Sequence, residues 1–365
     1  MPDDLLYRLA LTMIPELGPV RCKILIDHFG TAEAIFKARK KELSLLEGIG
    51  SSCATSIKNW HDFNRAEKEI GYLCKHQIQP LFLTDKHYPK RLLHCFDPPT
   101  LLFYKGNADL NCSRIISIIG TRNHTEYGKQ LTEQLIWSLQ SEQVLVVSGL
   151  AFGIDAIAHR TALQQHLNTV GVLGHGLDSI YPAQHISLAR EMILQGGLLT
   201  EFGTGSKPDK HNFPKRNRIV AGMCDATIVI ETAVKGGSMI TAELAFNYNR
   251  DLFAFPGRIG DNKSSGCLQL IRQNKACLIT GADQLLDSLG WLEKKKKIRK
   301  QKELFVQLTE NEQTIVALLN EQSPTHIDTV YLQSGLSSSK VAAALLNLEM
   351  QQVIISLPGK MYLLG

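Results

Sequence analysis

The sequence predicts an α/β protein whose central part is a parallel sheet with helices on both faces. Between residues 114 and 290, short and continuously apolar runs alternate with segments of helical periodicity. Continuously apolar strands are typical of a sheet buried on both faces, and the intervening helices are the crossovers that parallel strands require. The predicted strands are 115–119, 144–147, 170–173, 198–200, 226–230, 253–255 and 278–279, and the predicted helices include 128–140, 154–165 and 184–195.

The segments on either side of this region have other patterns and are expected to be separate domains. The N-terminal segment is helical, with two short Gly-containing turns at Leu17–Val20 and Leu46–Gly50. Such turns are typical of helix-hairpin-helix or SAM-like domains, in which the turn amides meet a phosphate or the helices only pack. The C-terminal segment has three helical patterns and a Pro-Gly turn between two apolar runs, which predicts a winged helix. The expected divisions are a helical domain at 1–80, an α/β domain at 81–290 that begins with a connector, a basic linker at 291–304 and a winged helix at 305–365.

The overall charge says little about partners. The chain has 365 residues, of which 44% are hydrophobic and 21% charged, as in ordinary globular proteins, and its formal net charge is +5. The stretch Lys294–Lys302 carries seven cations and no acid, so subtracting +7 from +5 leaves −2 for the rest of the chain. An interaction with nucleic acid must therefore be argued from local clusters of cations.

The eight cysteines form no Cys-x-x-Cys pair and no spacing typical of zinc, and several lie in apolar runs, as in Ala276–Ile279. We expect free thiols in a reducing compartment, and neither a metal nor a cofactor. The N-terminus is acidic where a signal peptide would be basic, and no apolar run approaches ~18 residues. A cytoplasmic protein with no membrane partner is expected.

Glycine-containing turns follow the predicted strands. They are Gly120–Gly128, Ser148–Asp155, Gly174–Gly176 and Lys235–Ser238. Ligands of open parallel sheets bind outside the carboxyl ends of the strands, so these turns are expected to meet at one edge. Backbone amides at glycine turns and helix starts can approach an anion. None of the turns has the Gly-x-Gly-x-x-Gly or Gly-Lys-Ser/Thr pattern, which argues against a dinucleotide or triphosphate site.

The segment Phe213–Cys224 places an aromatic ring, a proline and three cations ahead of a predicted strand. Pro214 suits the first position of a helix, and that helix would begin at the edge where the glycine turns gather. Lys215 and Arg218 lie three residues apart and share a face of the helix. Arg216 lies on the apolar side, so we expect it to be half-buried and rigid.

Phe213 is expected to be exposed just before this helix, while Asn217 adds an amide and Lys210 adds a further cation. Cations and a ring along one rim are typical of an interface with single-stranded nucleic acid, in which bases stack without being read. The alternative is a structural network in which the arginines pair with Glu201, Asp209 or Glu231.

Four segments resemble the signature of the DNA-processing protein A family, also called DprA or Smf. They are Ser148–His159, Phe213–Gly222, Gly236–Ala242 and Phe253–Gly257, and the resemblance covers roughly residues 85–290. It implies an extended Rossmann-like fold that binds single-stranded DNA and forms a homodimer. It also implies a mediator that helps load RecA onto incoming DNA during natural transformation. The family's Gly-Ser-Arg turn corresponds to Gly120-Thr121-Arg122, and its second cationic motif corresponds to Phe213–Arg218.

Two departures from the family pattern are visible. Thr121 replaces the usual serine, and His185 stands where asparagine is usual after Tyr181-Pro182. Neither departure removes a cation, and no catalytic or metal-binding residue is expected. The expected nucleic-acid-binding residues are Gly120, Thr121, Arg122, Ser148, Gly149, Lys210, Phe213, Lys215, Arg216, Asn217, Arg218, Lys235, Gly236, Gly237 and Ser238.

The main alternative is an enzyme. A related group of nucleotide phosphoribohydrolases carries Pro-Gly-Gly-x-Gly-Thr-x-x-Glu, and Glu243 stands at the distance of its Glu, which acts in N-glycosidic cleavage. However, Met239 fills the position of the glycine that lets backbone approach phosphate, and the threonine is displaced by one residue. A third hypothesis is a pure scaffold in which only the contact with RecA matters.

Three further features have two interpretations each. Asp155 and His159 lie four residues apart on one helical face, which suits either an acid–base or metal pair or an Asp that orients a His. The expected recognition helix of the winged domain, Ser337–Leu346, carries one cation, Lys340, so a protein contact or packing is favoured there over a grip on DNA. The lysine-rich linker is either solvated or in contact with DNA.

Overall fold

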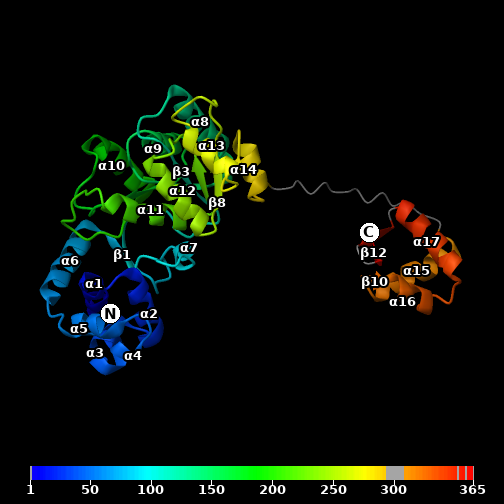
Figure 1. Cartoon of the computed structure of the whole chain (residues 1–365), viewed down its shortest axis with the longest axis horizontal. Coiled ribbons are helices and arrows are strands. Elements are labelled where there is room, and N and C mark those ends of the chain that lie inside the picture. Colours follow the sequence, from blue (N-terminus) through cyan, green and yellow to red (C-terminus); the bar gives the residue numbers. More distant parts are fainter. Residues whose placement is uncertain (1, 293–307, 352, 358–359, 365) are drawn as a thin grey trace. The chain divides into compact units, whose positions relative to one another are not determined.

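The computed structural model describes residues 2–292, 308–351, 353–357 and 360–364 (Figure 1). The chain divides into two compact units, one up to Leu292 and the other from Glu293 onward. From residue 293 on, the predicted basic linker lies outside the described residues. None of the described helices is both long and apolar enough to span a lipid bilayer.

The first unit opens with helices whose order matches the two predicted hairpin turns. They are α1 (Pro2–Met13), α2 (Pro19–Phe29), α3 (Ala32–Lys37), α4 (Lys40–Leu45), α5 (Gly50–Lys58) and α6 (Phe63–His76). The turn between α4 and α5 requires glycine, since φ is +85° at Gly48 and +67° at Gly50. Leu9, Leu25 and Ile35 are fully buried between these helices, so the segment has a hydrophobic interior.

A nine-stranded sheet forms the centre of the described part of the first unit. Its strands are β1 (Gln79–Phe82), β2 (Leu101–Gly106), β3 (Ile115–Ile119), β4 (Leu145–Ser148), β5 (Thr169–Leu173), β6 (Gly196–Thr200), β7 (Ala226–Val229), β8 (Asp251–Ala254) and β9 (Cys277–Leu278). Their order is β1-β2-β6-β5-β4-β3-β7-β8-β9, and the strands from β3 to β9 pair in parallel. The predicted parallel sheet is therefore confirmed.

The prediction of a connector at the start of the α/β domain is partly wrong. β1 and β2 extend the sheet, with β2 antiparallel to β6 through pairs such as Phe103↔Thr200. The proline breaks around this segment indicated a loop, but the buried run Leu101–Tyr104 completes the edge of the sheet. The predicted boundary at residue 80 accordingly falls inside β1.

Helices cover both faces of the sheet. They are α7 (Lys90–Leu93), α8 (Glu126–Ser138), α9 (Ile154–Gln164), α10 (Ile186–Leu194), α11 (Asn212–Gly222), α12 (Gly237–Asn247), α13 (Ser265–Arg272) and α14 (Ala282–Ser288), with short 3₁₀ turns at Gln140–Glu142 and Ala183–His185. Side chains of β3 alternate between two cores: Ile116 and Ile118 pack with α8, α9 and α14, and Ile115 and Ile119 pack on the side of α11, α12 and α13.

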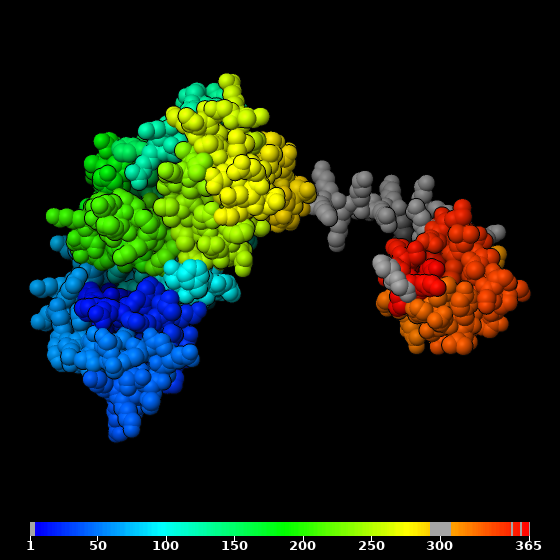
Figure 2. Space-filling view, viewed as in Figure 1, coloured from blue at the N-terminus to red at the C-terminus, as the bar shows by residue number. Residues whose placement is uncertain are grey.

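The N-terminal helices share a core with the second of these faces. The cluster that contains Ile115 continues into α1, α2 and α5. Polar contacts add to it, because Arg8 Nη1 donates to Asp85 Oδ1 (2.7 Å) and Thr204 N donates to Glu69 Oε1 (2.9 Å). In Figure 2 the blue N-terminal helices and the green and yellow α/β part of this unit form one unbroken surface.

All eight cysteines lie in the described residues and carry free thiols. Five of them are buried, as expected of small hydrophobic residues. Cys277 is an exception to the prediction, because it is exposed on the edge strand β9.

The second unit is the predicted winged helix. Its elements are α15 (Glu310–Glu321), β10 (Thr325–His326), α16 (Ile327–Gln333), α17 (Ser338–Met350), β11 (Ile354–Leu357) and β12 (Met361–Leu364), and the strand order is β10-β12-β11. Thr309 caps α15 in a capping box with Glu312. Ile315, Val330 and Leu348 form the centre of its own hydrophobic core.

Candidate nucleic-acid interface

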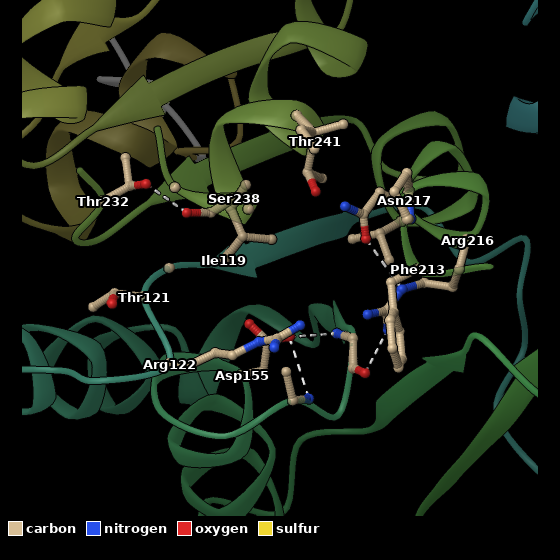
Figure 3. Close-up of a pocket in the computed structure, with 18 of the residues that line it drawn as sticks. Ile119, Thr121, Arg122, Asp155, Phe213, Arg216, Asn217, Thr232, Ser238 and Thr241 are labelled. Atoms are coloured by element: carbon tan, nitrogen blue, oxygen red, sulfur yellow. Dashed lines mark hydrogen bonds between the residues drawn. The ribbon is translucent and has the colours of Figure 1, made fainter. Parts of the chain in front are cut away.

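A pocket of about 530 Å³ lies beyond the carboxyl ends of β3, β4 and β7 (Figure 3). From β3 the chain proceeds outward through β4 to β6 on one side and through β7 to β9 on the other. The loops therefore diverge here and leave a crevice, which is where open α/β sheets bind ligands. Of the predicted residues, Gly120, Thr121, Arg122, Gly149, Lys210, Phe213, Arg216, Asn217, Gly236, Gly237 and Ser238 line the pocket, and Ser148, Lys215, Arg218 and Lys235 do not.

The Gly120–Arg122 turn is held from two sides. Thr121 N donates to Glu231 O (2.7 Å), and Thr121 O accepts from Ile154 N at the start of α9 (3.2 Å). The packing is close, because a Cβ at Gly153, where φ is +80°, would lie 2.2 Å from Thr121 O. The backbone is thus fixed while the Arg122 side chain remains exposed at the pocket, so little ordering is needed when an anion binds.

Glu231 fixes the same loop and does not pair with the arginines of α11. Glu231 is 2% exposed, and its carboxylate accepts hydrogen bonds from Thr125 N (2.9 Å) and Thr125 Oγ1 (2.8 Å), where Thr125 is the N-cap of α8. A Cβ at Gly128 would lie 2.7 Å from Glu231 Oε2, so α8 packs directly on the carboxylate. Glu231 therefore supports the loop that presents Arg122.

Arg216 is buried more deeply than predicted, with 5% exposure. Its Nη1 donates to the carbonyl oxygens of Gly149 and Val172, and its Nε donates to Asn217 Oδ1 (3.1 Å). A Cβ at Gly149 would lie 2.3 Å from Nη1, so a side chain there would displace the guanidinium group. Burial lowers the pKa of Arg216 to about 10, which leaves it charged at neutral pH. Arg216 thus ties α11 to the ends of β4 and β5 and places a fixed positive charge in the pocket wall.

Asp155 and His159 have different hydrogen-bond partners, so neither interpretation of them as a pair holds. Asp155 Oδ2 accepts from Gly149 N (3.1 Å) and Ala151 N (3.4 Å), and burial raises the pKa of its carboxyl group while the Arg216 charge lowers it. His159 Nδ1 instead contacts Thr169 Oγ1 (2.7 Å). Burial, with smaller effects of His185 and Arg216, lowers the pKa of His159 to about 3, so it is neutral. Asp155 is therefore a structural support of the loop after β4, and His159 contacts β5.

Arg218 is turned away from the pocket, which corrects the expectation that it shares an exposed face with Lys215. Its guanidinium pairs with the Glu201 carboxylate and donates to Asp97 O, and its side chain is 11% exposed. Lys215 is exposed, yet it does not line the pocket. The reason is the packing of α11, whose Arg218 side lies on the loop at Asp97. The structural-network interpretation thus holds for Arg218 and Glu201.

An aromatic row lies at the rim. Helix α11 begins at Asn212 and not at Pro214, so Phe213 lies in its first turn and not before it. Phe213 is half-buried, where an exposed ring was expected. The Phe213 ring centroid lies 5.8 Å from Arg122 Cζ and 6.0 Å from the ring of Tyr181. Tyr181 is 51% exposed and was not predicted to take part. Rings and a guanidinium in contact provide flat surfaces on which bases can stack.

The other predicted residues have simpler settings. Ser148 is fully buried, and its Oγ donates to Ile118 O (2.7 Å), so it serves the sheet and not the pocket. Lys235 is exposed in the loop after β7. His185, in place of the usual asparagine, is buried with its Nδ1 3.0 Å from Leu150 O, so the loop's hydrogen bonding is satisfied.

Sequence reasoning missed several lining residues, namely Asn123, Ala151, Thr232, Ala233, Ile240 and Thr241. Thr241 lies one helical turn beyond Gly237 on α12, so the spacing of four residues would have placed both on the same face. A threonine inside a helix carries no signal of its own, which is why it was passed over.

Glu243 does not line the pocket. Its two carboxylate oxygens accept from Lys275 Nζ at 2.8 and 2.7 Å. An ion-paired carboxylate outside the pocket is unsuited to act as a general acid or base on a ligand inside it. The hydrolase hypothesis therefore lacks its catalytic residue here.

The chain matches known family models along most of its length. The model described as DNA recombination-mediator protein A matches residues 79–290, the DprA winged helix domain matches 304–360, and a helix-hairpin-helix motif matches 7–70. The first match contains all nine strands of the sheet, and it includes every pocket residue named above.

Curated relatives and solved structures agree with these matches. Protein Smf of Synechocystis is 34% identical over 98% of both chains, and DNA processing protein DprA of Streptococcus pneumoniae is 42% identical over 56% of this chain and 72% of its own. The X-ray structure of the Streptococcus pneumoniae protein covers 77% of this chain and 95% of its own, with 32% identity and a TM-score of 0.66. A solved structure of DNA processing protein A from Helicobacter pylori covers 58% of this chain and 95% of its own, with 33% identity and a TM-score of 0.53. This chain belongs to the DprA/Smf family of DNA recombination-mediator proteins.

Proposed function

We propose that the pocket binds single-stranded DNA without reading its sequence. The observation that carries this proposal is the convergence of Arg122, Lys210 and the ring of Phe213 on one pocket whose floor and walls offer backbone amides. Cations follow the phosphates of a strand, and aromatic rings stack its bases whatever their identity. The solved Helicobacter pylori relative is described for its single-stranded DNA binding mode, which supports the same ligand for this chain.

Unpaired bases are the ligand that suits this geometry. The Phe213 ring and the exposed Tyr181 ring offer flat surfaces at the rim, and in a duplex the base faces are already stacked on one another. The pocket is also a local concentration of charge in a chain whose remaining charge is not strongly basic. Affinity should therefore be higher for single strands than for duplexes of the same length.

A salt titration of binding tests the proposal. The wild-type affinity for oligothymidylate and for a mixed-sequence strand should fall with salt, with a log–log slope of about −0.7 for each phosphate neutralised. Arg122→Ala should make the slope shallower by about 0.7. It should also lower the affinity for both strands by a similar factor, roughly tenfold. The matched control is Arg190→Ala, an exposed arginine on α10 outside the pocket. Equal affinities of the Arg122 and Arg190 variants would reject the site.

We further propose that the bound strand is passed to RecA, that the chain acts as a homodimer during natural transformation, and that it catalyses no reaction. The family match to a recombination mediator supports the first role. The chain should shorten the lag before RecA assembles on a protein-coated single strand, and light scattering should give twice the mass of one chain. An unchanged lag would reject the loading role, and a monomer at working concentration would reject the dimer.

The absence of catalysis has its own test. Release of free adenine from AMP by the purified protein, lost in Glu243→Ala, would restore the hydrolase hypothesis. The ion pair of Glu243 with Lys275 leads us to expect no release.

A further inference from the structure

The wall that α12 contributes to the pocket carries a hydroxyl group that no described residue uses. Thr241 is 4% exposed and lines the pocket, and its Oγ1 makes no hydrogen bond within the described part of the chain. Figure 3 shows this hydroxyl directed from α12 into the pocket. The Thr241 oxygen is not among the fully buried polar atoms that lack a partner in the described residues, so it is open to the pocket and can donate to a ligand there.

Neighbouring groups on the same wall are also donors. Gly237 N and Ser238 N are the first amides of α12, an 11-residue helix, and have no acceptor within it. The Ser238 hydroxyl is already used, since Oγ donates to Thr232 Oγ1 (2.6 Å). Asn217 Oδ1 accepts from Arg216 Nε, which leaves its Nδ2 as the donor that faces the pocket. Donors from α11 and α12 thus converge where the helix dipole favours negative charge.

We propose that this donor set is a subsite for a terminal phosphate monoester of the single strand, so that the pocket holds a strand end. The inference rests on the proposed binding of single-stranded DNA and deepens it. The amides of Gly237 and Ser238, the Thr241 hydroxyl and the Asn217 amide would each donate to a phosphate oxygen. Arg122 and Lys210 add positive charge on the lining of the same pocket.

The number of donors favours a terminal phosphate over an internal one. An internal phosphodiester joins two sugars and must leave the subsite in two directions, whereas a terminal monoester joins one sugar. A monoester also offers three free oxygens and a higher charge, which match the several donors and the helix N-terminus. A pocket of about 530 Å³ lies in the range for a single small ligand.

The acidic residue in the lining does not oppose this placement. Asp155 uses Oδ2 to accept from two backbone amides, and its charge is offset by the neighbouring Arg216. Asp155 belongs to α9 and the proposed donors belong to α11 and α12. The phosphate and the carboxylate are thus held by different walls.

Competition binding with the full chain tests the subsite. The probes are short oligothymidylates that carry a 5′-phosphate, a 3′-phosphate or hydroxyl groups at both ends, displacing a labelled strand. We expect one phosphorylated form to bind about tenfold more tightly than the hydroxyl form, as for a hydrogen-bonded charged group. Thr241→Val should bring this ratio close to one. Its Oγ1 has no partner among the described residues, so the substitution should not unfold the protein.

Thr161→Val is the matched control. Thr161 is a helical threonine of α9 with 2% exposure, and it does not line the pocket. This variant should keep the wild-type ratio. A preference that persists in Thr241→Val would overturn the assignment to this subsite, and a wild-type ratio of one would overturn strand-end recognition while leaving single-strand binding intact.

A second experiment distinguishes a subsite for free nucleotides from a failure of strand binding. Thymidine 5′-monophosphate and thymidine are titrated alone by calorimetry. If the monophosphate binds as tightly as the phosphorylated strand, the subsite serves free nucleotides and the strand-end proposal fails. If no strand binds at all, the proposed function fails, and a monophosphate that also shows no binding removes the phosphate subsite with it.

Discussion

Helix α11 of the first unit and helix α17 of the second both occupy places where proteins commonly meet nucleic acid, yet they are built differently. α11 carries Lys215, Arg216 and Arg218, and its N-terminal turn lines a pocket. α17 carries one cation, Lys340, and exposes apolar side chains, with Leu346 at 58% and Met350 at 76% exposure. Helix α17 therefore has little of the positive charge that binding to a DNA backbone uses.

The comparison also shows that a helix rich in cations is not uniformly a binding surface. On α11, Lys215 is exposed to solvent, Arg216 lies in the pocket wall, and Arg218 forms a buried ion pair. Three neighbouring residues thus have three different roles, set by the sides of the helix. Function follows from the surroundings of each side chain and not from the count of charges.

The largest expected effect comes from removing Arg216. Arg216→Ala takes away the hydrogen bonds to Gly149 O and Val172 O and leaves Asp155 buried without its opposite charge. We expect a loss of about 3–5 kcal/mol of unfolding free energy, as when one partner of a buried pair is removed. Urea denaturation measures it.

Lys215→Ala is the matched control for this change, since Lys215 is the preceding residue and is exposed. Its free energy of unfolding should stay within about 0.5 kcal/mol of wild type. If Arg216→Ala were equally neutral, Arg216 would not support the pocket, and the contrast between α11 and α17 would reduce to a difference in surface charge.

The second effect is a pH dependence of the first unit that comes from His159. Its pKa is 6.5 in the unfolded chain and is lowered to about 3 in the fold, so the unfolded state binds the proton more readily. The His159 contribution to stability is complete above pH 6.5 and is lost as the pH falls toward 3, by about 1.4 kcal/mol for each pH unit.

Tryptophan fluorescence isolates this effect, because Trp60, Trp137 and Trp291 all lie in the first unit. His159→Asn removes the titrating group and keeps a polar partner for Thr169. The difference in unfolding free energy between wild type and variant should therefore change with pH between 6.5 and 5. A difference that is constant over this range would show that His159 is not held neutral.

The sequence predicts the sheet well and the individual roles of the site residues less well. The apolar runs of β3 to β8 are local signals, since a strand buried on both faces must be apolar throughout. β2 was missed although Leu101–Tyr104 is an apolar run, because the prolines around it indicated a loop and its place depends on antiparallel pairing with β6. The glycine turns were correctly expected to gather at one edge, since parallel strands end on the same side.

Side-chain roles on α11 required the tertiary structure. The burial of Arg216 followed from its position on the apolar side of the helix. The acceptor of Arg218 at Asp97 is 121 residues away in the chain, so no local pattern reveals it. Thr241 carries no signal in the sequence, and only the tertiary structure places it on the pocket lining.

A smaller effect is expected from the ring of Phe213. Phe213→Ala should weaken single-strand binding by about 1 kcal/mol, the low end of the range for one stacked base, because the ring is already half-buried. Phe152→Ala is the control, since Phe152 is 43% exposed and does not line the pocket. Fluorescence anisotropy with oligothymidylate compares the two. Equal affinity of the two variants would show that the Phe213 ring packs the pocket rim and stacks no base.

The smallest effect is expected from Lys340, and it tests the other side of the comparison. Lys340→Ala removes the one cation of α17, a helix that also exposes Leu346 and Met350. A single Lys releases about one counterion from a duplex, too few for stable binding, so single-strand affinity, duplex affinity and the salt slope should all stay at wild-type values. Salt-titrated binding to both forms of DNA measures this. A severalfold loss of duplex affinity would place α17 on phosphates, and the apolar exposure of Leu346 and Met350 would then have to be explained beside a DNA backbone.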